Sequence, residues 1–225
     1  PVPEQQTTAL ANFRRQLSPH PSPTHPLAHP PAEPQPPTYS HEVFEAFPVR
    51  GFQRGPEQIE ELMVTTEKGQ IKETWAPAPE LPPCTLDPRA FPTGHRFEIA
   101  DSVRSWLKEC LAPLTRGSLL TIDYGGSPAE IYHRRPRGTL RGYFLHQAVA
   151  GEALYEHPGH QDLTVDVNFE DLQSWTREAG FQTREFLPQA DFLASHHPPC
   201  SEVESFLGGP IGAGEAFKVL IQRKG

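Results

Sequence analysis

Apolar residues recur at helical spacing in one segment near the middle of the chain. They stand at i, i+4, i+7, i+8, i+11 and i+12, and they are Ile99, Val103, Trp106, Leu107, Cys110 and Leu111. This spacing predicts an amphipathic helix that approaches its end at Pro113. Cys110 falls on the apolar side, so we expect a small buried core residue there.

A nearly continuous apolar strand is predicted next, over residues 118–124. Leu119, Leu120 and Ile122 lead into Asp123 and Tyr124, and two glycines follow. Such a run is typical of a strand that is covered on both faces. A helix, a short link, an apolar strand and a glycine together indicate an α/β sheet, in which ligands bind at the carboxyl ends of the strands.

Other patterns predict further elements between residue 38 and the end of the chain. A short strand ends near Ser40, and alternation over residues 60–77 predicts a hairpin whose turn holds Glu67, Lys68 and Gly69. Residues 81–94 are interrupted by prolines and are predicted to form a loop. Asn168 is a predicted helix cap and Gly180 the stop of that helix. Two last strands are expected around Phe186 and over residues 217–221.

Residues 19–37 contain nine prolines, and proline both lacks an amide donor and restricts the residue before it. We therefore expect a solvated, disordered, polyproline-like linker there. Before it, Leu10, Phe13 and Leu17 predict a short helix within residues 1–18. The expected domain is residues 38–225.

Composition narrows the function classes. The net charge of −8 argues against a nucleic-acid partner, and no apolar run is long enough for membrane insertion. The three cysteines are far apart and show neither a disulfide framework nor zinc spacing, so a reducing compartment is expected. The histidines lack acidic or cysteine partners at metal-ligand spacing, so no metal is expected.

Four segments carry a family resemblance in family order and spacing. They are HEVFEAFPVRGFQ (41–53), LLTIDYG (119–125) with the nearby RGTLRGYFLH (137–146), PGHQDLTVDVNFEDL (158–172) and GEAFKVLIQRK (214–224). Together they resemble the MidA-like class I methyltransferases, which include the mitochondrial complex I assembly factor with protein-arginine methyltransferase activity. Glu45 stands where that family usually has Asp, and Phe47 where it has Leu.

The resemblance implies an α/β fold that is the C-terminal part of a class I, Rossmann-like sheet with a hairpin insertion. It also implies S-adenosyl-L-methionine as co-substrate, with Glu4 and His41 as donor-binding residues. The family's glycine-rich turn after the first strand has no match here, because no glycine precedes Gly51. We therefore expect residues 1–18 to be a remnant of the donor-binding half, and donor binding by this chain is in question.

Candidate catalytic residues are the acids at the predicted strand ends, Glu42, Glu45 and Asp123. An arginine guanidinium stays protonated in water, so carboxylates must orient it and help to remove a proton during methyl transfer. Each acid has an alternative. Glu42 and Glu45 could be first-turn acids that complement a helix dipole, and Asp123 could only form a turn. His41 could likewise be a hydrogen-bonded structural residue.

The resemblance further implies a substrate pocket with Tyr124, His146, Gln161, Asp162 and Thr164. Arginines alternate with tyrosines nearby, at Arg135, Arg137 and Arg141. With a net charge of −8, we interpret this segment as a loop that folds over the site and pairs with acids, rather than as a nucleic-acid surface.

Two functions remain open at this point. The first is a methyltransferase that modifies arginine in a protein substrate, and the second is a non-catalytic interaction or assembly module derived from that family. A homo-oligomer is a further expected partner class. The expected compartment is the cytoplasm for a bacterial protein and the mitochondrial matrix for a eukaryotic one.

Overall fold

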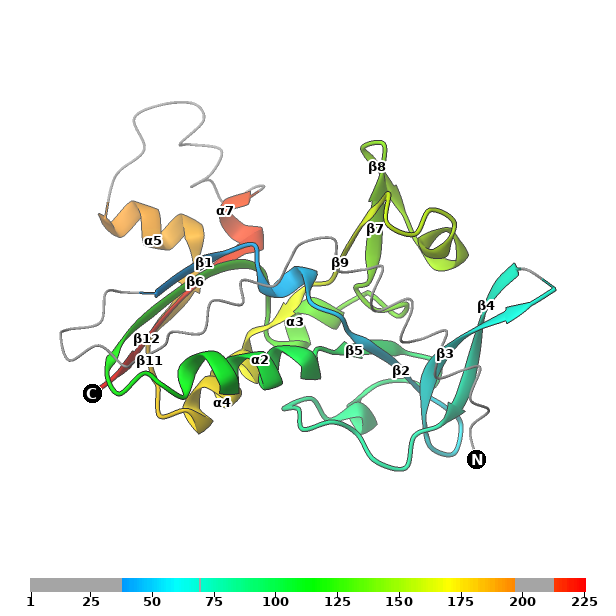
Figure 1. Cartoon of the computed structure of the whole chain (residues 1–225), viewed down its shortest axis with the longest axis horizontal. Helices are drawn as coiled ribbons and strands as arrows, with labels where there is room; N and C mark the ends of the chain where they lie inside the picture. The colour runs from blue at the N-terminus through cyan, green and yellow to red at the C-terminus, as the bar shows by residue number, and fades with distance from the viewer. Residues whose placement is uncertain (1–37, 69, 197–212) are drawn as a thin grey trace. The chain divides into compact units, whose positions relative to one another are not determined.

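A computed structural model describes residues 38–68, 70–196 and 213–225 (Figure 1). The predicted N-terminal helix, Glu4 and the proline-rich linker lie outside these residues, so the domain boundaries at 18 and 37 stay predictions. The described residues form two compact units. The first unit contains residues 46–102 and 132–165, and the second contains residues 38–45, 103–131, 166–196 and 213–225.

The second unit is built on a five-stranded mixed sheet with the order β1-β6-β12-β11, in which β10 also pairs with β6 (Figure 1). Its strands are β1 (Thr38–His41), β6 (Gly117–Gly126), β10 (Val167–Asn168), β11 (Gln182–Pro188) and β12 (Phe217–Lys224). The pairs β1–β6 and β10–β6 are parallel, whereas β6–β12 and β12–β11 are antiparallel. This confirms a mixed α/β fold and the strands predicted near Ser40, Ile122, Phe186 and Val219.

The central strand β6 buries one face more completely than the other. Leu119, Thr121 and Asp123 are buried, whereas Leu120 and Ile122 on the opposite face are only half-buried. Both faces of β6 are therefore covered, as predicted, but one of them less completely than the other. A pleated strand sends alternate side chains to opposite faces, and the two faces need not be covered equally.

The predicted central helix is observed as α2 (Asp101–Leu111), but two of its predicted positions were wrong. Ile99 belongs to the preceding strand β5 (Arg96–Ile99), because the helix begins two residues later. Cys110 is exposed, since the buried line of the helix is Val103, Leu107 and Leu111. Cys110 precedes Leu111, and consecutive helical residues point about 100° apart.

The helix after β10 has the predicted boundaries. The Asn168 side chain accepts hydrogen bonds from the backbone N–H groups of Glu170 (3.1 Å) and Asp171 (3.4 Å), which makes Asn168 the N-cap of α4 (Phe169–Glu178). Gly180 follows the helix with a φ of 90°. The left-handed region is open to glycine at little cost, so the helix can stop there.

The first unit contains two antiparallel sheets, with the orders β4-β3-β2-β5 and β8-β7-β9. The strands not yet given are β2 (Arg50–Arg54), β3 (Ile59–Glu67), β4 (Gln70–Pro77), β7 (Arg141–Phe144), β8 (Gln147–Val149) and β9 (Asp162–Thr164). The β3–β4 pair confirms the predicted hairpin. Phe52 and Phe97 are fully buried and stack with ring centroids 5.6 Å apart, which centres the core of the larger sheet on these two rings.

Short helices complete the described residues. They are η1 (Phe44–Ala46), η2 (Pro88–Ala90), α3 (Pro128–Tyr132), η3 (Gly151–Tyr155), α5 (Gln189–His196) and α7 (Ala213–Ala216). Apart from η2, the proline-interrupted segment 81–94 is irregular, as predicted. The pairing of β2 with β5 and the β8-β7-β9 sheet were not predicted from the sequence.

Candidate functional site

Asp123 joins the carboxyl ends of the parallel strands β1 and β6. The Glu42 N–H continues the ladder by donating to the Ile122 carbonyl at 3.0 Å. One Asp123 carboxylate oxygen, Oδ2, then accepts hydrogen bonds from the backbone N–H groups of Val43 (3.2 Å) and Phe44 (3.0 Å). These bonds place the turn that follows β1, and with it the acids of that turn, at the end of β6.

The Asp123 carboxyl is fully buried, and its other oxygen, Oδ1, accepts from the Tyr124 backbone N–H at 2.9 Å. Burial raises the pKa of Asp123 to about 7, the Phe44 N–H opposes this rise, and the negative charge of Glu45 adds to it. Because both oxygens already accept backbone hydrogen bonds, the geometry favours a positioning role for Asp123 over direct contact with a substrate.

Glu42 and His41 lie at the same edge and are open to solvent. The His41 Nδ1 is 3.5 Å from the Glu42 carboxylate, and these side chains are 42% and 47% exposed. The His41 ring stacks on Tyr39 and on Phe217, with centroids 6.3 and 6.0 Å apart. Glu42 has a φ of 50°, which is uncommon for a residue other than glycine. A carboxylate with this exposure can receive a cationic ligand.

Glu45 and Tyr124 complete the predicted residues in the second unit. Glu45 is half-buried and lies in η1, which is a single helical turn. This position fits the alternative interpretation of Glu45 as a first-turn acid that complements a helix dipole. The Tyr124 ring packs edge-on against Phe217 at 5.5 Å. The structure therefore brings His41, Glu42, Glu45, Asp123 and Tyr124 to one edge of the sheet.

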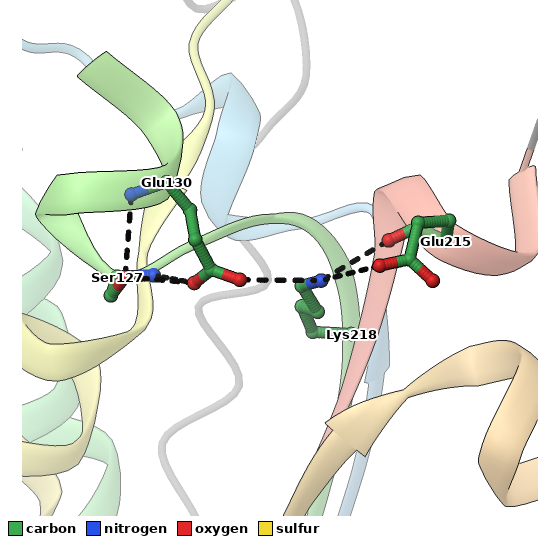
Figure 2. Close-up of polar contacts among 4 residues, drawn as sticks. All are labelled: Ser127, Glu130, Glu215 and Lys218. Atoms are coloured by element: carbon green, nitrogen blue, oxygen red, sulfur yellow. Dashed lines mark hydrogen bonds and ion pairs between the residues drawn. The ribbon is translucent and has the colours of Figure 1, made fainter. Parts of the chain in front are cut away.

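A buried lysine lies at this edge as well (Figure 2). Lys218 is directly opposite Asp123 in the β6–β12 ladder, and its side chain is only 7% exposed. Its ammonium donates to the Glu215 carbonyl at 3.2 Å and lies 3.8 and 3.9 Å from the carboxylates of Glu130 and Glu215. We did not predict this residue, and the one signal for it was a lysine inside the apolar segment FKVLI.

Ser127 and Glu130 cap α3 reciprocally, as Figure 2 shows. The Glu130 carboxylate accepts from the Ser127 N–H (2.7 Å) and hydroxyl (2.8 Å), and the Glu130 N–H donates to the Ser127 hydroxyl (3.3 Å). The Ser127 N–H lowers the pKa of Glu130, and the Ser127 hydroxyl and the Lys218 charge act in the same direction. Glu130 therefore stays ionised beside the buried ammonium.

The remaining predicted pocket residues belong to the first unit. His146 is exposed in the β7–β8 turn with a φ of 64°, and Asp162 is paired with Tyr143 across the β9–β7 ladder. Thr164 is buried, and the Gln161 side-chain amide donates to the Leu154 carbonyl. These four residues belong to β9, to the residue before it and to the adjoining hairpin turn. Their role in a substrate pocket stays a prediction.

The predicted arginine-rich loop also belongs to the first unit, so its closure over the acids stays a prediction. In the part of the chain that the structure describes, no group of three His, Cys, Asp or Glu side chains is placed to hold a metal ion. No helix among these residues is long and apolar enough to span a membrane.

A mixed α/β sheet with acids at the carboxyl ends of its parallel strands is an architecture common among enzymes that bind small molecules at that edge. A family model described as "Putative S-adenosyl-L-methionine-dependent methyltransferase" matches residues 4–187. The chain therefore belongs to this methyltransferase family. This confirms the resemblance at the level of the family, and three of the four sequence segments lie within the matched residues.

Two crystal structures of proteins from Burkholderia thailandensis are similar to this chain. One, a superfamily member bound to S-adenosyl-homocysteine, has 25% sequence identity and a TM-score of 0.72, and the match covers 84% of this chain and 53% of that one. The other, an uncharacterized superfamily protein in its native form, has 25% identity and a TM-score of 0.71, with 84% and 55% covered. The chain thus spans just over half the length of these proteins. None of the curated proteins matches it.

Proposed function

We propose that this chain is the acceptor-side part of an S-adenosyl-L-methionine-dependent methyltransferase whose acceptor is an arginine side chain of a protein. The observation that carries the proposal is the turn after β1, which Asp123 holds at the end of β6 and which presents Glu42 and Glu45. Family membership supports the reaction class, and the S-adenosyl-homocysteine in one similar structure supports the donor.

In the proposed reaction, Glu42 and Glu45 contact the guanidinium and Asp123 holds their turn in place. The guanidinium is a planar cation whose N–H groups suit carboxylate oxygens. As its nitrogen takes up a methyl group, that nitrogen must lose a proton, and a carboxylate within hydrogen-bond reach is a suitable acceptor. Glu42 is the exposed carboxylate of the pair and is therefore the proposed base.

The described residues do not fit a complete donor site. No glycine precedes Gly51, and the turn after β1 has Glu42, not a glycine, in the left-handed region. His41 is the exposed side chain at this edge that remains a proposed donor contact. We therefore derive no chemical step through the donor.

Calorimetry with S-adenosylmethionine and S-adenosylhomocysteine tests donor binding by the 225-residue chain. Micromolar binding of either ligand supports an enzyme whose donor site works without a glycine-rich turn in residues 1–50. A folded sample that binds neither ligand contradicts catalysis by this chain alone. Circular dichroism on the same sample establishes that it is folded.

Transfer of a labelled methyl group from the donor to peptides with a single arginine or a single lysine tests the acceptor. For a sample that binds the donor, we expect labelling of the arginine peptide, and we expect Glu42→Gln to reduce its rate by about a hundredfold, the typical effect of a general base. Glu57→Gln is the matched control, because Glu57 is exposed and lies outside the site. Preferential labelling of lysine, or equal rates for the two variants, contradicts the proposed acceptor and base.

The second candidate function is a non-catalytic interaction or assembly module derived from the family. The absence of glycine from residues 1–50 favours it, since no glycine-rich donor turn can form there. It predicts no donor binding together with stable association, either with a protein partner or with a second copy of the chain. Sedimentation of the purified chain with and without S-adenosylmethionine separates the two functions. The methyltransferase predicts that the donor can alter the sedimentation of the chain, whereas the interaction module predicts the same sedimentation with and without the donor.

A further inference from the structure

One segment of this acidic chain is strongly basic. Between Glu130 and Glu152 there is no acidic residue but there are four arginines, although the whole chain has a net charge of −8. Three of these arginines lie in residues 133–140, which we call the arginine loop. Their side chains, those of Arg134, Arg135 and Arg137, are all exposed.

The carboxylate of Glu98 binds the arginine loop through several hydrogen bonds. Glu98 accepts hydrogen bonds from the Thr139 N–H (3.0 Å), the Thr139 hydroxyl (3.1 Å) and the Leu140 N–H (3.3 Å). The Tyr132 hydroxyl donates to the same carboxylate at 3.2 Å. Burial raises the pKa of Glu98, and the donors from Thr139 and Leu140 oppose the rise. A carboxylate with this many donors holds the loop in a single conformation.

The backbone of the loop is also tied to its surroundings. The Gly138 N–H donates to the Arg135 carbonyl at 3.0 Å, and the Pro136 carbonyl accepts from the Arg96 N–H at 2.9 Å. Gly138 has a φ of 82°, and a Cβ at this position would overlap the Glu98 carboxylate. A side chain here would be strained by the positive φ and would displace the Glu98 carboxylate that binds the loop, so glycine suits this position.

Two of the arginines that this loop presents are available to a partner. Among the described residues, neither Arg134 nor Arg137 has a side-chain hydrogen bond or an ion pair, and Arg134 has a φ of 58°. Left-handed backbone is costly for a residue other than glycine and tends to persist at functional positions. We propose that the arginine loop is a docking surface for an acidic protein segment, whose carboxylates pair with these guanidiniums. This proposal does not depend on the proposed methyltransferase activity.

Charge and shape favour an acidic protein segment over a nucleic acid. Single-stranded nucleic acids bind through a series of aromatic side chains on which successive bases stack. Tyr132, directly before this loop, is 4% exposed and turned toward Glu98, and Tyr143, three residues after the loop, is 43% exposed. One exposed tyrosine ring, not a series, therefore adjoins the loop. A long polyanion also meets the repulsion of a chain with a net charge of −8. The neighbouring guanidiniums of Arg134 and Arg137 match a short run of carboxylates, each of which can be bound bidentately. A rigid loop also loses little conformational entropy on binding.

Fluorescence anisotropy of a labelled oligoglutamate peptide tests the proposal on the full chain. We expect binding that weakens as salt is added, because exposed charge pairs are screened. We expect the variant with Arg134→Gln, Arg135→Gln and Arg137→Gln to bind about tenfold more weakly, since each exposed ion pair contributes up to a few-fold in affinity. If this variant melts at a lower temperature, the Arg134→Gln, Arg137→Gln double variant replaces it.

A matched control removes the same charge elsewhere. Arg89, Arg177 and Arg184 are exposed, and their combined change to Gln leaves the loop intact. Equal binding of the peptide by the control and the loop variant, or no binding by the unaltered chain, overturns the proposal. An oligothymidylate of equal charge is the competing probe. If it binds more tightly than the peptide and is lost in the loop variant, the partner is a nucleic acid and the proposed class is wrong.

Discussion

Asp123 makes the stability of this chain depend on pH in a direction opposite to that of most acidic residues. Its pKa is raised from 3.8 to about 7 by burial, with a further contribution from the charge of Glu45. Between these two values the unfolded chain has released the proton while the folded chain still holds it. Stability therefore falls as pH rises from about 4 to about 7, and it stays level above that.

The size of the effect follows from the shift. A difference of about three pKa units corresponds to about 4 kcal/mol in the free energy of unfolding, at 1.36 kcal/mol per unit. This is a large part of the 5–15 kcal/mol by which an ordinary domain is stable. The result should be visible even against the titration of other groups, provided that it is measured as a difference between two proteins.

Urea unfolding of the unaltered chain and of Asp123→Asn over this pH range supplies that difference, because the amide does not titrate. We expect the stability of the unaltered chain relative to Asp123→Asn to fall steadily as the pH rises. Glu45→Gln should move the fall to lower pH, since it removes a neighbouring negative charge. Asp191→Asn, at an exposed position, is the control for the loss of a carboxylate that is not buried. The same pH dependence for the two variants, or a level difference for Asp123→Asn, would refute the buried-acid reasoning.

Three further changes should have measurable effects on stability. Gly125→Ala places a Cβ 2.7 Å from the Val167 backbone nitrogen, so we expect it to lower the free energy of unfolding in urea by about 3 kcal/mol. Gly159→Ala is the control, because φ is also positive there but no atom is near, and we expect it to cost about 1 kcal/mol. Burial lowers the pKa of His95, so the unfolded chain takes up a proton on this side chain before the folded chain does. Relative to His95→Gln, the unaltered chain should therefore lose stability as pH falls below about 6.5. A gain in stability relative to His95→Gln over this range would contradict the prediction. Asn168→Ala should lower the unfolding free energy by about 1 kcal/mol because a helix cap is lost, and an unchanged urea midpoint would argue against that cap.

Elements whose signals are local could be read directly from the sequence. The hairpin over β3 and β4 follows from alternation and a Lys-Gly turn, and α4 follows from the Asn168 cap, the apolar spacing and Gly180. These patterns involve residues that are close together in the sequence, so they do not depend on tertiary contacts. The same reasoning erred at Ile99, because an apolar strand residue extended the helical spacing by chance.

The candidate site was predictable only in part. Placing Glu42 and Asp123 together required the rule that parallel strands meet at their carboxyl ends, and the structure bears out that juxtaposition. That Asp123 uses both oxygens on backbone amides was not predictable, because its partners Val43 and Phe44 are far away in the sequence. The roles of these residues in chemistry stay predictions.

The sequence by itself determined the β3–β4 hairpin, the strands β1, β6, β11 and β12, the helices α2 and α4, the acidic residues that end the strands, and the family. The tertiary structure decided which charged groups are buried, as at Lys218 and Asp123, and where a glycine permits two backbones to meet, as at Gly125. The physical reason is the range of the forces involved. Backbone propensity and capping act between near neighbours, whereas desolvation and strand pairing depend on residues that only the folded chain brings together.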